Sequence, residues 1–449
     1  MHVTLEEMLL ARDARAKIQN DLLNKHGCPL ISFTMNVAGP RKTSPKIERA
    51  FRVGVELIDK ALVGKKVEYR REEHNKCGPV SFFSVNIDAK ELKDKLVEIE
   101  DTHPLGRLFD MDVIDVCGAH LSRKQERGCI VCGAPGRACA AGRLHPLEEI
   151  TSATEKIIND YFLAFDSKRV AHLAKEALIA EVYTSPKPGL VDPESRGSHK
   201  DMNVCHFVRS AEALEPYFEQ FIACGAEFAK KSPQDVFPAL KKIGIDAERA
   251  MYAATDNKNT HKGAIFSFGI ILGAIGRLMA VGDGIPTPKE ILKEAKEISK
   301  SAVEEALATA DGSTAGARAY LNHGERGARG EAADGFPTVK SFGLPIYREA
   351  LDNGKNKNDA GAITLLHLIK EIFDTSLYKR GGAAGVEYAR EQVTRLLRSG
   401  EPSTERIRTL DRAFTKRNLS PGGAADLLAI TYFLYELEES RKTTPSSRD

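Results

Sequence analysis

An uninterrupted run of small and apolar residues, Gly263–Gly276, constrains the fold of this chain more than any other feature. The run is apolar all round, so it predicts a helix buried inside a helical domain. It lies between Lys262 and Arg277 and is too short to cross a bilayer. Asn259 and His261 stand just before it, so a capping side chain and cationic groups meet at a helix N-terminus, which suits a phosphate-bearing ligand. An ordinary helix start with a hydrogen-bonded histidine is the alternative.

Further segments of the C-terminal two thirds place glycine, proline or serine beside basic side chains. Lys187 lies between two prolines in a rigid turn, and residues 324–331 place two arginines among glycines that permit close backbone approach. Ser420 is a good helix cap, Pro421 fits the first helical position, and the two glycines that follow leave the helix amides open to a ligand. Together these helix starts indicate sites for phosphate, although each alone is typical of a turn.

Strand and helix periodicities divide the chain into an α+β part and a helical part. Residues 31–37 and 83–87 alternate apolar and polar side chains, as half-buried strands do, and residues 47–62 keep helical spacing. Strand-like alternation becomes scarce after residue 165. A chain of 449 residues exceeds the usual limit of one core, so we expect an α+β domain over residues 1–162 and a larger all-α domain over residues 163–449.

Two carboxylates, Asp110 and Asp112, lie in a run that is typical of a strand. Residues two apart on a strand share a face, so these side chains are expected to project together. Paired carboxylates of this kind hold magnesium beside a phosphate chain. A strand with a solvated acidic face is the alternative.

A group of cysteines with one histidine follows this strand. Cys129, Cys132, Cys139 and His145 have the ligand types of a structural zinc site, although the spacing between Cys132 and Cys139 is not that of a standard zinc ribbon. The surrounding loops are rich in arginine, which is also typical of a zinc knuckle that binds nucleic acid. A loop of reduced thiols is the third interpretation.

The motifs of the C-terminal part resemble those of triphosphoribosyl-dephospho-CoA synthase, a helical enzyme that starts the synthesis of the citrate lyase cofactor. The resemblance spans about Leu163 to Leu437 in the family's order. Its motifs are SPKPGLVD (185–192), GSHKDM (197–202), NTHKG (259–263), TAGAR (314–318), GARGEA (327–332), RGG (380–382) and NLSPGGAADLL (418–428). Phe373 and Ser376 depart from the family's more usual Gly and Asn.

The N-terminal part resembles apo-citrate lyase phosphoribosyl-dephospho-CoA transferase, a nucleotidyltransferase. The resemblance implies a nucleotidyltransferase-like fold, and the whole chain resembles a fusion of two consecutive enzymes. Ala141 and the segment 126–128 depart from the family pattern. The motifs are VAGP (37–40), HPLGRLFDMDV (103–113), LSR (121–123), the cysteines 129, 132 and 139, and His145.

The two resemblances imply a chemistry for each domain. In the second, the 2′-hydroxyl of 3′-dephospho-CoA attacks the anomeric carbon of ATP and adenine leaves. In the first, a serine of the acyl carrier (gamma) subunit of citrate lyase attacks the phosphate next to the ribose and pyrophosphate leaves. The candidate catalytic residues are Asp110, Asp112, Arg107, Arg123, Glu181, Asp192, Asp201, His199 and His261, with Asp359 and Asp426 as further carboxylates. The candidate nucleotide-binding residues are Lys187, Lys262, Asn259, Arg326, Arg329, Gly330, Arg380, Ser420, Gly422 and Gly423.

Composition limits the classes of protein and of binding partner that remain possible. With 65 basic against 63 acidic residues, no strong field favours nucleic acid or a membrane as partner. Eight cysteines in so long a chain do not indicate a secreted disulfide framework, and the start of the sequence lacks the apolar stretch of a signal peptide, so we expect a cytoplasmic protein. The alternatives are a nucleotide N-glycohydrolase, a related enzyme of malonate decarboxylase cofactor synthesis, a nucleic-acid-binding module and a non-catalytic scaffold.

Overall fold

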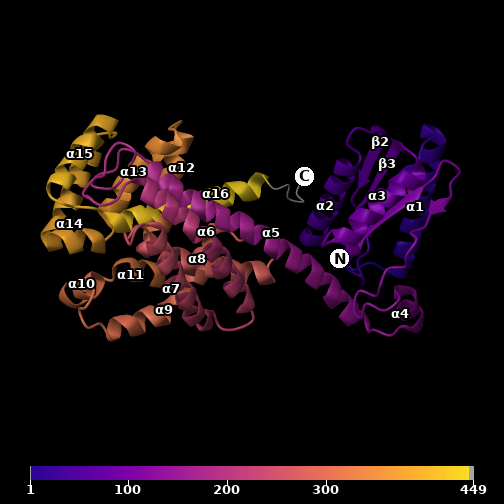
Figure 1. The fold of residues 1–449 in the computed structure, drawn as a ribbon, viewed down its shortest axis with the longest axis horizontal. Helices are drawn as coiled ribbons and strands as arrows, with labels where there is room; N and C mark the ends of the chain where they lie inside the picture. Colours follow the sequence, from indigo (N-terminus) through magenta and orange to yellow (C-terminus); the bar gives the residue numbers. More distant parts are fainter. Residues whose placement is uncertain (1, 444–449) are drawn as a thin grey trace. The chain divides into compact units, whose positions relative to one another are not determined.

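The computed structural model describes residues 2–443, which divide into two compact units between Ala164 and Phe165 (Figure 1). The first unit contains the five strands of the described chain and is α+β. The second unit is helical and has no strand within residues 165–443. A small mixed unit followed by a larger helical unit confirms the fold class that the sequence patterns predicted.

The sheet of the first unit has the order β2-β3-β1-β4-β5, and every neighbouring pair is antiparallel. In the pairing of β1 with β4, Thr34 lies opposite Asp110 and Ser32 lies opposite Asp112. The two aspartates therefore share one face of the sheet, as their spacing predicted. The strands are β1 (Leu30–Met35), β2 (Lys66–Glu73), β3 (Val80–Asn86), β4 (Phe109–Ile114) and β5 (His120–Leu121).

Helices cover both faces of this sheet. Leu30 and Ile114 pack with α1 on one face, whereas Ile31 and Phe33 pack with α2 and α3 on the other. The first four residues of β1 are consequently all buried, so the prediction of a half-buried strand was wrong there, because α1 covers the second face. The bounds are α1 (Leu5–His26), α2 (Pro45–Ala61), α3 (Ala89–Thr102), the 3₁₀ turn η1 (Gly106–Leu108) and α4 (Gly136–Gly142).

Helix α5 (Leu147–Tyr183) begins in the first unit and ends in the second. The other helices of the second unit follow it in chain order (Figure 1). They are α6 (Val204–Glu227), α7 (Phe237–Ala254), α8 (Lys262–Val281), α9 (Pro288–Ala308), α10 (Ala315–His323), α11 (Gly327–Ala333), α12 (Leu344–Asp352), α13 (Lys357–Glu371), α14 (Thr375–Arg398), α15 (Thr404–Lys416) and α16 (Gly422–Thr443), with a 3₁₀ turn η2 (Pro233–Val236) and a π-helical turn η3 (Val339–Gly343).

Helix α8 is the central helix of the second unit, and it packs against α6, α7, α9 and α16. It extends to Val281, so by length and composition it could span a bilayer, and the prediction that it is too short was wrong. Its apolar window is 78% buried inside the unit, which accounts for its composition. Glycines allow α6 and α8 to approach closely, since a Cβ at Gly276 would lie 1.9 Å from the carbonyl oxygen of Ile222.

Candidate functional sites in the two units

The first unit contains a cavity of 1080 Å³ beside β4 and β5. Asp110 and Asp112 line it together with Arg107, Arg123 and Arg127. The structure therefore brings the four predicted residues of this unit into one cavity. Arg127 is an addition, since the sequence pattern marked it only as part of a basic loop.

The two aspartates of the cavity have different surroundings. Asp110 is exposed and accepts a hydrogen bond from the Thr34 hydroxyl at 3.4 Å, whereas Asp112 is half-buried. Burial raises the pKa of Asp112, and the charge of Asp110 raises it further. A divalent cation between these carboxylates would relieve their repulsion, so the pair is suited to hold one.

The arginines of the cavity are fixed by backbone carbonyls and by carboxylates. Arg107 donates to the carbonyl of Gly128 at 2.7 Å, and Arg127 donates to the carbonyl of Phe109 at 2.7 Å. Arg127 also pairs with Glu100 at 2.6 Å. The pKa of Arg107 is lowered by burial and then by the neighbouring Arg127. These contacts hold positive charge in the same cavity as the aspartates, and a phosphate chain with a bound cation requires both kinds of group.

Two charged residues of α3 support this cavity and were missed in the sequence. Lys93 donates to the carbonyl of Met111 at 3.0 Å, and Glu100 accepts the amide of Met111 at 2.9 Å. Both side chains are buried although they are charged. The sequence could have indicated their burial, because they fall on the same helix face as Leu92 and Leu96, where apolar residues are expected.

The predicted zinc ligands also lie together in the first unit. The ligand atoms of Cys129, Cys132, Cys139 and His145 all lie within 4.8 Å of one another. Within residues 2–443, this is the one group of three or more cysteine, histidine or acidic side chains close enough to share a metal ion.

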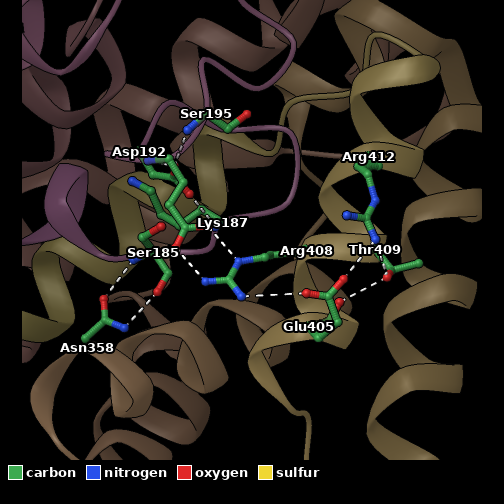
Figure 2. A network of polar contacts seen from close by, with 10 residues as sticks. Ser185, Lys187, Asp192, Ser195, Asn358, Glu405, Arg408, Thr409 and Arg412 are labelled. Atoms are coloured by element: carbon green, nitrogen blue, oxygen red, sulfur yellow. Dashed lines mark hydrogen bonds and ion pairs between the residues drawn. The ribbon is translucent and has the colours of Figure 1, made fainter.

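In the second unit, the turn after α5 is held by side chains from distant helices (Figure 2). Asn358 of α13 accepts from the amide of Ser185 at 2.8 Å and donates to its carbonyl at 2.7 Å. Asp192 accepts the amides of Lys187, Glu194 and Ser195, each at 2.8 Å. The buried carboxylate of Asp192, a candidate catalytic residue, therefore holds the turn in shape.

Lys187 is fully enclosed, with only 1% of its side chain exposed. Its ammonium pairs with Glu181 and also donates to the carbonyl of Glu181 at 2.7 Å. The prediction that Lys187 offers a free charge to phosphate was therefore wrong for this structure, because Glu181 already neutralises it. Glu181 is buried as well, with 6% of its side chain exposed.

His199, Arg380 and Ser420 come from three separate motifs and meet in the structure. Nε2 of His199 lies 2.9 Å from the Ser420 hydroxyl, and Arg380 donates to the carbonyl of Ser198 at 2.9 Å and to Asn418 at 2.8 Å. Burial lowers the pKa of His199 to about 4, with Arg380 adding to the effect. Arg380 thus supplies the positive charge here, while His199 is neutral at pH 7. The charge of the exposed Asp201 raises the pKa of both His199 and Arg380, against the effect of burial.

The start of α8 differs from the prediction in its charges. Burial lowers the pKa of His261 to about 3, followed by the effect of Lys187, so the imidazole is neutral and the prediction of a cation was wrong. Its Nδ1 lies 2.7 Å from the Ser210 hydroxyl, whereas its buried Nε2 has no hydrogen-bond partner among the described residues. Lys262 is exposed and pairs with Glu248, and Asn259 accepts the amide of Lys262 at 3.3 Å.

The start of α16 is occupied by a carboxylate rather than open. Asp374 accepts the amide of Ala424 at 2.9 Å, so the expectation that Gly422 and Gly423 leave the helix end uncovered was wrong. Burial raises the pKa of Asp374. Ser420 and Gly422 nevertheless stand beside α14, because the Cα of Gly422 faces the Ser376 side chain.

Asp426, near the start of α16, brings the starts of α8 and α16 together. A Cβ at Gly263 would lie 2.1 Å from its carboxylate, and the amide of Ala264 donates to it. Its pKa is raised well above the ordinary value by burial, then by the charges of Glu181 and Asp374. Taken as a whole residue, Asp426 is half-buried.

The glycine-rich segment 324–331 is a loop only over residues 324–326, and its remaining residues belong to α11. Gly324 ends α10 with a φ of 70°, and α11 begins at Gly327, whose Cα packs against Thr375. Arg326 pairs with Asp334 at 2.8 Å. Gly330 is buried within α11 beside Arg326, and Arg329 lies on the same helix. Asp359 lies in the first turn of α13 and lines a cavity of 330 Å³.

Both units match known families. Residues 167–445 match the family ATP:dephospho-CoA triphosphoribosyl transferase (CitG), and residues 3–161 match the family apo-citrate lyase phosphoribosyl-dephospho-CoA transferase (CitX). The chain is therefore a transferase enzyme.

Relatives that span both units show how the two families combine. The chain is 33% identical to Protein CitXG of Haemophilus influenzae and 34% identical to Protein CitXG of Leuconostoc mesenteroides subsp. cremoris, covering 96% and 97% of the two relatives and the same shares of this chain. A 2-(5''-triphosphoribosyl)-3'-dephosphocoenzyme-A synthase of Pectobacterium atrosepticum is 41% identical over 61% of this chain and 90% of its own length. The chain belongs to the CitXG family of citrate lyase prosthetic-group biosynthesis, which joins a CitX domain to a CitG domain.

Proposed function

We propose that this protein both makes and attaches the prosthetic group of citrate lyase. The second unit joins ATP to 3′-dephospho-CoA with release of adenine, and the first unit transfers phosphoribosyl-dephospho-CoA to a serine of the apo acyl carrier subunit with release of pyrophosphate. The observation that carries the proposal is the order of the two families in one chain, each over a unit with its own cluster of charged residues. The acyl carrier subunit and the nucleotides are the partners that the proposal requires.

The second unit offers two carboxylates in different surroundings for the first reaction. The 2′-hydroxyl attacks C1′ of the ATP ribose, a C–O bond forms, the bond from C1′ to adenine breaks, and the hydroxyl proton passes to adenine. Asp426, whose pKa is raised, can carry this proton between the reactants. Glu181, buried beside the Lys187 ammonium, can stabilise the positive charge that develops on the ribose.

The triphosphate of ATP needs cationic groups close to this carboxylate pair. Arg380 stands beside Ser420 and His199 and keeps part of its side chain exposed. Lys262, at the start of α8, is more than half exposed and is held only by a surface ion pair. We assign both to the phosphates, while Nε2 of His261 remains to donate to or accept from a bound group.

The first unit carries the second reaction. The serine hydroxyl attacks the phosphorus next to the ribose, a P–O bond forms, the bond to the departing pyrophosphate breaks, and the hydroxyl proton is released with the pyrophosphate. Asp110 and Asp112 fit a magnesium ion because they share one face, line one cavity and repel each other, and such an ion would neutralise the departing phosphates. Arg107, Arg123 and Arg127 line the same cavity and supply positive charge there.

One experiment tests the whole proposal. The full chain is incubated with ATP, magnesium, 3′-dephospho-CoA and apo carrier, and the products are identified by mass spectrometry, with each component left out in turn. We expect adenine, pyrophosphate and a carrier heavier by phosphoribosyl-dephospho-CoA, and no adenine without 3′-dephospho-CoA. Adenine release in its absence would instead indicate an N-glycohydrolase, and no turnover of ATP would indicate a scaffold.

A further inference from the structure

The segment 122–146 of the first unit has almost no hydrophobic core of its own. Cys139 is its single buried residue, although the segment lines the cavity with Arg123, Arg127 and Arg143. A stretch that buries so little apolar surface does not hold a fixed shape by packing alone. It therefore requires another source of order.

The backbone around Cys129 is folded into a tight turn that points amides toward sulfur. The amide of Gly133 donates to the carbonyl of Cys129 at 2.9 Å, with Gly133 at a φ of 74°. The amide of Val131 lies 3.4 Å from Sγ of Cys129. An amide donated to sulfur stabilises a thiolate, which is the form that binds a metal ion.

The distances in the cluster match the edges of a tetrahedron around zinc. Zn–S bonds of about 2.3 Å and Zn–N bonds of about 2.0 Å place two sulfurs about 3.8 Å apart and a sulfur and a nitrogen about 3.5 Å apart. Sγ of Cys132 lies 3.5 Å from Sγ of Cys139 and 3.3 Å from Nε2 of His145. A disulfide would require sulfurs about 2.05 Å apart, so the spacing is that of ligands and not of a bond.

The second nitrogen of the histidine supports the same interpretation. Nδ1 of His145 lies 3.2 Å from the carboxylate of Glu149, one turn further along the chain. A carboxylate on the far nitrogen fixes the tautomer and the orientation of a histidine that binds zinc. Four protein ligands leave no open position for substrate, which is typical of a structural site.

We propose that the first unit binds one structural zinc ion through Sγ of Cys129, Cys132 and Cys139 and Nε2 of His145. The ion closes the segment 122–146 and so holds one wall of the cavity. Through the contact of Arg107 with the carbonyl of Gly128, the residue before Cys129, it also orients an arginine that lines the same cavity as the aspartates. The proposal does not depend on the reaction assigned to this unit.

The test is the metal content of the full chain, purified under reducing conditions from zinc-supplemented cells and measured by elemental mass spectrometry. We expect one zinc per chain in the wild type and in Cys117→Ser and Cys205→Ser, which change exposed cysteines outside the cluster. Cys132→Ser and His145→Ala should lower zinc retention about tenfold or more in the presence of a competing chelator. His145→Cys, which restores a fourth ligand, should recover it.

A second measurement covers variants that fail to fold. Cobalt replaces zinc in the wild-type protein, and we expect the strong visible absorption of a tetrahedral ion and the near-ultraviolet band of thiolate ligation. Removal of the metal should also expose residues 122–146 to limited proteolysis. The proposal would be overturned if the wild-type protein contained no zinc and took up neither ion. It would also be overturned if peptide mapping found a Cys132–Cys139 disulfide in protein purified under reducing conditions.

Discussion

At the scale of single residues, burial decides which groups carry charge. His261 and His199 look like cations in the sequence, yet both are neutral because they lie out of water beside Lys187 or Arg380. For carboxylates burial has the opposite effect on the pKa. It raises the pKa of Asp426 and of Asp112, so both hold protons more tightly than exposed carboxylates do. Both units therefore place proton-holding carboxylates beside fixed positive charge.

Neutral His261 makes the second unit sensitive to acid. Its pKa is lowered to about 3 from an ordinary value of 6.5, so the unfolded chain binds a proton that the folded chain does not, and stability falls as pH drops below about 6.5. This group alone should cost about 1.4 kcal/mol for each pH unit between there and about pH 4. Urea unfolding followed by helical ellipticity should show a shallower pH dependence in His261→Gln than in the wild type. An unchanged slope would contradict the buried neutral imidazole.

Asp112 should affect the pH dependence of stability in the opposite direction to His261. Its pKa is raised in the folded state, so folding favours the protonated form, and the stability that this form contributes is lost as pH rises through the folded pKa. Without magnesium, Asp112→Asn should therefore unfold at a higher urea concentration than the wild type at pH 7, and the difference should vanish at low pH. Asp94→Asn, an exposed position, is the control. Magnesium should stabilise the wild type but not Asp112→Asn.

At the scale of elements, helix contacts in the second unit depend on glycine. The close approach of α6 and α8 leaves no room at Gly225 or Gly276, since a Cβ at Gly225 would lie 2.0 Å from the carbonyl oxygen of Gly273. The same geometry places Gly263 against Asp426. These glycines therefore act as points of packing between helices.

Gly276→Ala should destabilise the second unit by about 1–3 kcal/mol, because overpacking against the backbone of α6 exceeds the gain in helix propensity. Gly244 of α7 offers a matched control, since a Cβ there has no atom within 4 Å. Gly244→Ala should stabilise the protein by about 0.5–1 kcal/mol. Thermal and urea unfolding of the two variants measure both values, and equal effects would contradict the packing argument.

At the scale of the whole molecule, two sets of catalytic candidates lie in two separately folded units. The first set, which contains Asp110 and Asp112, lies in the α+β unit. The second set, which contains Asp426, lies in the helical unit. No residue of one set takes part in the described contacts of the other. The two reactions should therefore be separable by single substitutions.

Asp110→Asn should lower carrier modification by about 100-fold or more while adenine release continues at the wild-type rate. Asp426→Asn should slow adenine release to a similar degree, yet still modify the carrier when supplied with the purified intermediate. Adenine and carrier mass are measured in the same samples, and circular dichroism checks folding. Loss of both activities in either folded variant would show that the two-site division is wrong.

Local patterns in the sequence determined the class of each unit and several groupings within it. Apolar spacing predicted the α+β and helical units, because backbone geometry fixes which residues share a face. The same rule placed Asp110 beside Asp112. The short spacing of Cys129 and Cys132 predicted neighbouring ligands, since few backbone conformations can separate them.

The tertiary structure alone decided the partners and charge states of the remaining residues. It paired Lys187 with Glu181, placed Asp374 on the start of α16, and brought Arg127 and Glu100 to the cavity. These outcomes depend on contacts between segments far apart in the chain and on the exclusion of water. A periodicity over a few residues carries no information about either.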